Sequence, residues 1–247
     1  MRTYSSSLLI ILALASAIVM TACGETAPAP TDPPPPAPTD PPPEASPTIA
    51  PPTETPIPKP TATPELEILY EDDFSDPNSG WESYRAFDGV LDYEDGAYRL
   101  HADAAYQTFW VFYTGNYADL VLEAEARYLD GPQSNSYGVL CRYSSNPLAF
   151  YAFLINVQGQ AQIALWSDGS LAILQSASFE PRDFNVEPDF LRAACIRDQL
   201  SLAVNGELLI ELEDASLAQG DFGMLISNGA EGATTAQIEH LTLRLPE

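Results

Sequence analysis

The chain has 247 residues, with 10 basic and 35 acidic side chains and a net charge of −25. Of its 23 prolines, 17 fall within residues 24–64, a composition that cannot bury enough apolar surface to fold. Residues 65–247 carry 8 arginines, no lysine and 30 acids, a net charge of −22. This charge excludes a nucleic-acid binder, which needs a basic face, and excludes electrostatic attraction to anionic lipid.

Residues 1–22 have the pattern of a secretory signal peptide. Arg2 gives a positive start, and residues 8–20 are an apolar run that only Ser16 interrupts. This run is too short for a transmembrane helix. Together with Cys23, the small residues Thr21 and Ala22 resemble a bacterial lipoprotein signal.

That resemblance implies that Cys23 carries lipid, including palmitate, and becomes the mature N-terminus. The protein would then be extracytoplasmic and lipid-anchored to a bacterial cell membrane, since acyl chains hold a protein without a basic patch. The alternative is an ordinary secretory signal in which Cys23 has no role.

Residues 23–64 are expected to form a disordered linker rich in proline and threonine. Such a segment favours polyproline II, at about 3.1 Å per residue, and would reach roughly 120 Å if straight. We interpret it as a stalk between the anchor and the folded domain. A docking site for proline-reading partners, or a glycosylated Thr-Pro stretch, stays open.

After residue 66, apolar residues alternate with a period of two, which is typical of half-buried β-strands. In residues 120–128, for example, Leu122 and Ala124 share one face while Glu123 and Glu125 share the other. The pattern predicts strands at 98–101, 108–113, 120–128, 137–143, 150–157, 160–166, 191–197, 200–204, 207–211, 222–226 and 235–243.

Turn signals separate these strands. Asp-Gly and Asn-Gly pairs supply the positive φ of tight hairpins, and Asn205-Gly206 is the strongest of them. In the last strand, Ile238 and Leu241 have opposite parity, which predicts a bulge at Glu239-His240. Many short antiparallel strands in one domain predict an all-β, two-sheet jelly-roll sandwich.

Several segments resemble the concanavalin A-like lectin/glucanase superfamily, and within it laminin-G-like and 3-keto-disaccharide hydrolase domains. These segments are Asp-Asp-Phe-Ser-Asp at 72–76, Tyr-Gly-Val-Leu-Cys-Arg-Tyr at 137–143, Leu-Arg-Ala-Ala-Cys at 191–195 and Gly-Asp-Phe-Gly at 220–223. The resemblance covers about residues 70–245. It implies the jelly-roll fold, and relatives of this fold often hold a structural Ca²⁺ where the first and last strands meet.

Asp73 and Glu239 are the candidates for that Ca²⁺ site. Ca²⁺ takes six to eight oxygen ligands, and the sequence offers only two or three here. The alternative is that these are solvated acids of an acidic domain. No other cofactor is expected.

The catalytic motif of jelly-roll glucanases, Glu-x-Asp-x-x-Glu on one strand, is absent. Two segments, residues 123–128 and 211–216, match this motif in part. They have Tyr128 and Ser216 at the position where a second carboxylate is needed. His101 and His240 are far apart in sequence, and no glycine-rich phosphate loop precedes a helix, which argues against a nucleotide enzyme. The sequence therefore favours a domain that is not an enzyme.

Two cysteines remain after Cys23, and both fall in the middle of predicted strands. Cys141 and Cys195 would form a disulfide if these strands are neighbours, as expected in an oxidising compartment. The alternative is two buried thiols.

Polar and aromatic residues on the central strands suggest a ligand site on an open sheet face. The candidates are Arg142, Tyr151, Trp166 and Arg192, because an arginine within an apolar strand is expected to point out of the core. We interpret the protein as a surface lipoprotein whose non-catalytic domain binds glycan or another extracellular ligand. The alternatives are a structural or protein-interaction module of the cell envelope and a carbohydrate-active hydrolase.

Overall fold

The computed structural model describes residues 67–246, and its regular elements are all β-strands. The predicted signal peptide, the lipidation site Cys23 and the linker up to residue 64 lie outside the described residues. Within the described part, no helix is long and apolar enough to cross a membrane.

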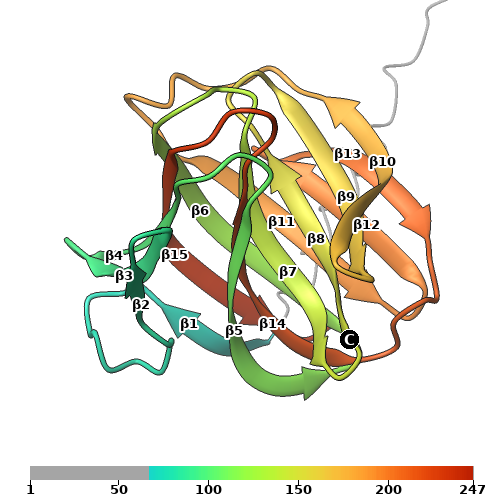
Figure 1. Ribbon diagram of the computed structural model, residues 1–247. Coiled ribbons are helices and arrows are strands. Elements are labelled where there is room, and N and C mark those ends of the chain that lie inside the picture. The colour runs from blue at the N-terminus through green and yellow to red at the C-terminus, as the bar shows by residue number, and fades with distance from the viewer. Residues whose placement is uncertain (1–66, 247) are drawn as a thin grey trace, which may run out of the picture. The chain divides into compact units, whose positions relative to one another are not determined.

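The strands form two antiparallel sheets (Figure 1). Sheet A has nine strands, in the order β13-β12-β11-β6-β15-β4-β3-β2, with β1 paired to the second half of β15. Their bounds are β1 Ile68–Asp72, β2 Tyr84–Ala86, β3 Gly89–Glu94, β4 Ala97–Ala102, β6 Leu120–Asp130, β11 Asp189–Ile196, β12 Gln199–Val204, β13 Glu207–Glu213 and β15 Thr234–Arg244.

Sheet B has six strands, in the order β10-β9-β8-β7-β14-β5. Their bounds are β5 Thr108–Tyr117, β7 Ser136–Ser145, β8 Leu148–Ile155, β9 Gln160–Ser167, β10 Ser170–Ser178 and β14 Gly220–Ser227. The prediction of an all-β, two-sheet sandwich is confirmed.

The main core lies between the two sheets and is built by the predicted alternation. Leu122 and Ala124 of β6 face Val139 of β7 and Phe153 of β8, and all four are buried. Burying apolar side chains from both inner faces is the main favourable contribution to the folding of such a sandwich.

The predicted local features of the chain also appear. The Asn205-Gly206 turn has φ of 53° and 87°, as a tight hairpin between β12 and β13 requires. The register of β15 against β6 shifts between Ile238 and His240, which confirms the bulge. All eleven predicted strands are present, whereas β1, β2, β3 and β10 were not predicted.

Cys141 on β7 and Cys195 on β11 form a disulfide. Because β7 belongs to sheet B and β11 to sheet A, the bond links the two layers of the sandwich through the core. The two strands are therefore neighbours across the sandwich and are not hydrogen-bonded partners.

Candidate functional site

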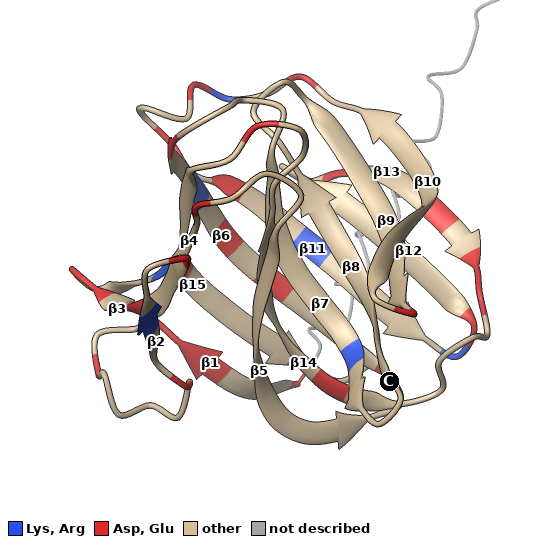
Figure 2. Cartoon of the chain, in the orientation of Figure 1, with Lys and Arg blue, Asp and Glu red and all other residues tan. Residues whose placement is uncertain are grey.

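The strands of sheet A carry most of the charged residues that lie in strands (Figure 2). Glu123 on β6 pairs with Arg192 at 3.5 Å and with Arg244 at 2.8 Å. On the same face, Arg127 pairs with Glu239. In these pairs, acids and bases on neighbouring strands partly neutralise one another.

The outer face of sheet B is apolar and aromatic instead. Its cluster, here called the aromatic platform, contains two stacked rings, Phe150 and Trp166, with centroids 5.7 Å apart. Trp110 lies 5.2 Å from Trp166 and 5.3 Å from Phe150. The remaining members are Phe112 and Tyr143, which stack on each other at 4.2 Å.

Small residues allow the platform to form across the sheet. Trp110 is on β5 and Trp166 on β9, with three strands between them, so about 19 Å separates their backbones in a flat sheet. The two rings belong to one cluster with Ala152 and Ala164, whose small side chains leave room above the strands between them.

Beside Trp166, the same face holds an open hollow of about 540 Å³. Its lining is amphipathic and uncharged. Apolar contacts come from Leu154, Trp166 and Leu171, and polar groups come from Thr108, Ser134, Ser136, Gln160, Gln162, Ser227 and Asn228.

The rim of the hollow carries Tyr106, which sequence reasoning missed. The residue is 79% exposed, and its backbone has φ of 57°, a conformation that bulky residues rarely adopt. The Tyr106 amide donates a hydrogen bond to the carbonyl of Gly229 at 2.7 Å. No sequence pattern marks this residue, because it lies in a loop between β4 and β5.

A buried asparagine network supports this rim. Asn228 donates to the carbonyls of Ala102 and Ala104, both at 2.9 Å. Asn135 donates to Thr234 Oγ1 at 2.6 Å and accepts from the amide of Gly229 at 2.8 Å. Buried polar groups satisfied in this way hold the loops around the hollow in one arrangement.

Trp166 is the one predicted ligand residue that lies at this hollow. Its Nε1 donor is buried and has no acceptor within residues 67–246. Leaving such a donor unpaired costs about 1–3 kcal/mol.

The prediction for Arg142 was wrong, because this side chain lies inside the sandwich and is only 1% exposed. The register of β7 against β8 shifts between Cys141 and Ser144, and Arg142 has φ of 53°. This bulge places two consecutive side chains on the inner side of the strand. The Arg142 guanidinium donates to three backbone carbonyls, those of Ala118, Arg197 and Leu217.

The prediction for Tyr151 was also wrong. Its side chain is buried in the core, and the Arg142 guanidinium lies 6.0 Å from its ring centroid. The Tyr151 hydroxyl donates to Asp214 Oδ1 at 2.5 Å and accepts from the Leu217 amide at 3.0 Å. Burial and the hydrogen bond to Asp214 raise the pKa of Tyr151, so the hydroxyl remains a donor that anchors the loop after β13.

Arg192 lies on the outer face of sheet A, opposite the face that carries Trp166. The four predicted ligand residues therefore do not meet in one site. Two are in the core, and the other two are on opposite faces of the sandwich.

The two Ca²⁺ candidates are not gathered into a ligand cluster. Within residues 67–246, no group of three or more acidic, histidine or cysteine side chains has the geometry to hold a metal. The oxygens of Glu239 accept hydrogen bonds from Arg127, which hold its carboxyl pKa below the usual value. The amide of Ser75 and its hydroxyl both donate to Asp73, and these bonds lower its pKa. The Ca²⁺ site stays a prediction.

No protein-family model matches the sequence, and no curated protein matches it either. Solved structures, however, are similar in fold. A galectin-like protein of unknown function from Bacillus subtilis superposes with a TM-score of 0.57 at 10% identity, covering 73% of this chain and 97% of that one.

Two further solved structures match this chain over nearly their whole length. The carbohydrate binding module CBM66 from Bacillus subtilis has a TM-score of 0.50 at 15% identity, covering 67% of this chain and 95% of that one. The catalytic domain of an endo-1,3-β-glucanase from Thermotoga petrophila has a TM-score of 0.52 at 9% identity, covering 72% and 97%. The described residues thus share a jelly-roll sandwich fold with these solved structures.

Proposed function

We propose that the outer face of sheet B binds a neutral glycan in the hollow beside Trp166. One observation carries this proposal: the hollow combines aromatic and aliphatic surface with hydroxyl and amide groups and has an uncharged lining. A sugar ring has an apolar face, which stacks on aromatic rings, and hydroxyls, which bond to side chains of the serine and glutamine type.

The rim completes the proposed site. Tyr106 stands exposed on one side of the hollow, and Trp166 lies within it, so a saccharide would contact an aromatic ring from each. A strained backbone conformation in an exposed aromatic residue is typical of functional positions. We infer that the asparagine network holds Tyr106 in place for the ligand.

The net charge of the chain indicates which classes of glycan are suitable ligands. With a net charge of −25, the chain repels polyanions at low salt, so sulfated and phosphate-containing polymers are poor ligands. An open hollow buries only part of a ligand, so we expect affinities in the micromolar to millimolar range.

The proposed binding is non-catalytic. Glycoside hydrolysis generally needs two carboxyl groups around the scissile bond, about 5 Å or more apart. The described residues that line the hollow include none. Glu123, which belongs to one of the two partial matches to the glucanase motif, lies on sheet A. There it forms ion pairs with two arginines.

We further propose that the protein is a lipoprotein that presents this domain outside the cytoplasm on a proline-rich stalk. The signal-like residues 1–22, the following Cys23 and the composition of residues 24–64 support this placement. The disulfide between Cys141 and Cys195 is consistent with an oxidising compartment.

A glycan array tests the proposed function. The purified protein should bind neutral oligosaccharides, and Trp166→Ala should reduce the signal about tenfold. An aromatic contact contributes about 0.5–1.5 kcal/mol beyond its buried area, and about 1.4 kcal/mol corresponds to a tenfold change in affinity. Arg192→Ala, on the opposite face, is the matched control and should bind normally. If the array shows no binding, or if both variants bind equally, the domain is a structural or protein-interaction module of the envelope instead.

A further inference from the structure

Strand β5 forms an edge of sheet B, and its regular part, residues 108–113, which precedes a bulge, lacks the usual protection. Its ten residues, Thr-Phe-Trp-Val-Phe-Tyr-Thr-Gly-Asn-Tyr, contain no charged residue and no proline. Natural edge strands are short, charged or interrupted, because an unpaired edge accepts other strands. The edges of sheet A follow this rule: β2 has three residues, and β13 carries Glu207, Glu211 and Glu213.

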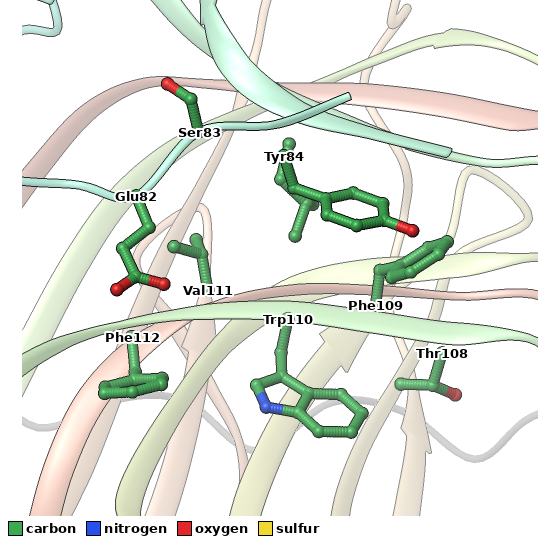
Figure 3. A pocket seen from close by; sticks show the side chains of 9 residues that line it. Glu82, Ser83, Tyr84, Thr108, Phe109, Trp110, Val111 and Phe112 are labelled. Atoms are coloured by element: carbon green, nitrogen blue, oxygen red, sulfur yellow. The ribbon is translucent and has the colours of Figure 1, made fainter. Parts of the chain in front are cut away.

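A groove of about 450 Å³ runs along this edge (Figure 3). Residues 82–84 form one wall, and residues 108–112 of β5 form the other. The rings of Tyr84 and Phe109 lie 5.5 Å apart toward one end, whereas the carboxylate of Glu82 lies toward the other. Phe109 packs so closely on Gly89 that a β-carbon there would lie 2.5 Å from its ring.

The wall opposite β5 is held in place. The Glu82 carbonyl accepts a hydrogen bond from the Tyr98 hydroxyl, and the Tyr84 hydroxyl donates to Asp88 at 2.8 Å. Ser83 donates to Asp92 at 2.7 Å. The Glu82 carboxylate, by contrast, has no hydrogen-bond or ion-pair partner within residues 67–246 and is exposed.

We propose that β5 binds an extended, basic segment of a partner protein as an additional strand. Backbone hydrogen bonds to the β5 edge would supply affinity, and alternate side chains would supply specificity. A lysine or arginine of the segment would pair with Glu82, and an apolar side chain would pack on Tyr84 and Phe109. Of the residues that line this groove, only Thr108 also lines the glycan hollow, and the proposal does not depend on glycan binding.

Charge complementarity selects this occupant over a second copy of the chain. Residues 65–247 contain 30 acids and 8 arginines, so two copies repel each other while a basic segment is attracted. Pairing one uncharged edge with another edge of the same chain would have to overcome this repulsion.

Isothermal titration of the purified full chain with a blocked octapeptide of alternating lysine and valine tests the proposal. We expect binding that Glu82→Gln weakens about fivefold, the upper end for an exposed ion pair. Glu207→Gln removes the same charge from the far edge of sheet A and should leave the affinity unchanged. A peptide with N-methylated backbone amides should not bind, because it keeps its charges but has lost the N–H groups that would donate hydrogen bonds to β5.

Three results would overturn the proposal. These are no binding of the unmethylated peptide, equal binding of the methylated one, and equal effects of Glu82→Gln and Glu207→Gln. Concentration-dependent dimerisation in light scattering without peptide binding would assign the edge to a second copy and also reject the proposal. Trp166→Ala should leave peptide binding intact, so failure of the glycan proposal remains distinguishable.

Discussion

Arg142 is the largest of the fully buried side chains in the described part of the chain. Its guanidinium bonds to carbonyls of three loops, which precede β6, follow β11 and precede β14. An isolated buried charge is costly, but here the guanidinium makes three charge-assisted hydrogen bonds to backbone and lies 3.7 Å from Asp119 Oδ1. Arg142 therefore fixes one end of the sandwich instead of binding ligand.

Replacing Arg142 with methionine should lower the free energy of unfolding by about 3–5 kcal/mol, because three backbone carbonyls lose a charge-assisted donor from the core. Urea unfolding followed by fluorescence would measure it. Arg192→Met, whose side chain is 41% exposed, is the control and should cost less than about 1 kcal/mol. Equal losses in the two variants would contradict the structural role of Arg142.

The pair of Arg127 and Glu239 gives a prediction for pH dependence. Hydrogen bonds from Arg127 lower the pKa of Glu239 below 4.5, outweighing partial burial. Because the folded-state pKa is depressed, the stabilisation is complete above pH 4.5 and is lost as the pH falls through the lower, folded value.

Glu239→Gln should therefore lower stability at pH 7, by up to about 1 kcal/mol, and the difference from the parent should shrink below pH 4.5. Thermal unfolding across this pH range measures the effect. Glu211→Gln, a change on an exposed strand position, is the matched control. A difference in stability between variant and parent that does not change with pH would contradict the stabilising role of the Arg127–Glu239 pair.

At the scale of elements, period-two alternation identified the strands that have one buried and one wet face. It missed β10, whose residues are almost all exposed, because no core side imposes a pattern there. It also missed β1, β2 and β3, of which β2 has only three exposed residues. Strands could be predicted where one face is buried and the other is exposed, because such strands alternate apolar and polar residues.

The candidate site was harder to predict. The alternation of side chains along β7 predicts that Arg142 lies on the outer face of sheet B. The bulge in β7 moves its side chain to the inner face, and no sequence pattern indicates this bulge. The hollow draws residues from several strands and loops, so nothing in sequence spacing brings Trp166 and Tyr106 together. Only Trp166 was anticipated.

The disulfide links β7 to β11, and its removal should destabilise the sandwich. The cysteines are 54 residues apart, so chain entropy predicts a loss of about 4 kcal/mol for the Cys141→Ala/Cys195→Ala protein. Denaturant unfolding measures the loss, and reduction of the parent protein serves as the control. Two titratable thiols in the unfolded, unreduced parent would contradict the bond.

At the scale of the whole molecule, we propose that an anchor at Cys23 and a proline-rich stalk carry the ligand-binding domain. Lipidation predicts that Cys23 is the acylated N-terminus of the mature protein, which mass spectrometry would detect. Cys23→Ser should release the protein into the medium or block its processing. An unmodified N-terminus at another residue would contradict the anchor.

The central claim is that glycan binds on the outer face of sheet B. The chain has three tryptophans, of which Trp110 and Trp166 lie on that face while Trp81 is buried in the core between the sheets. Their indole N–H signals in a ¹H–¹⁵N spectrum, recorded while the best neutral glycan from the array is added, therefore test the claim most directly. The account predicts that the signals of Trp166 and Trp110 shift with ligand and that the Trp81 signal does not. Saturable binding without a shift at Trp166 or Trp110 would contradict it.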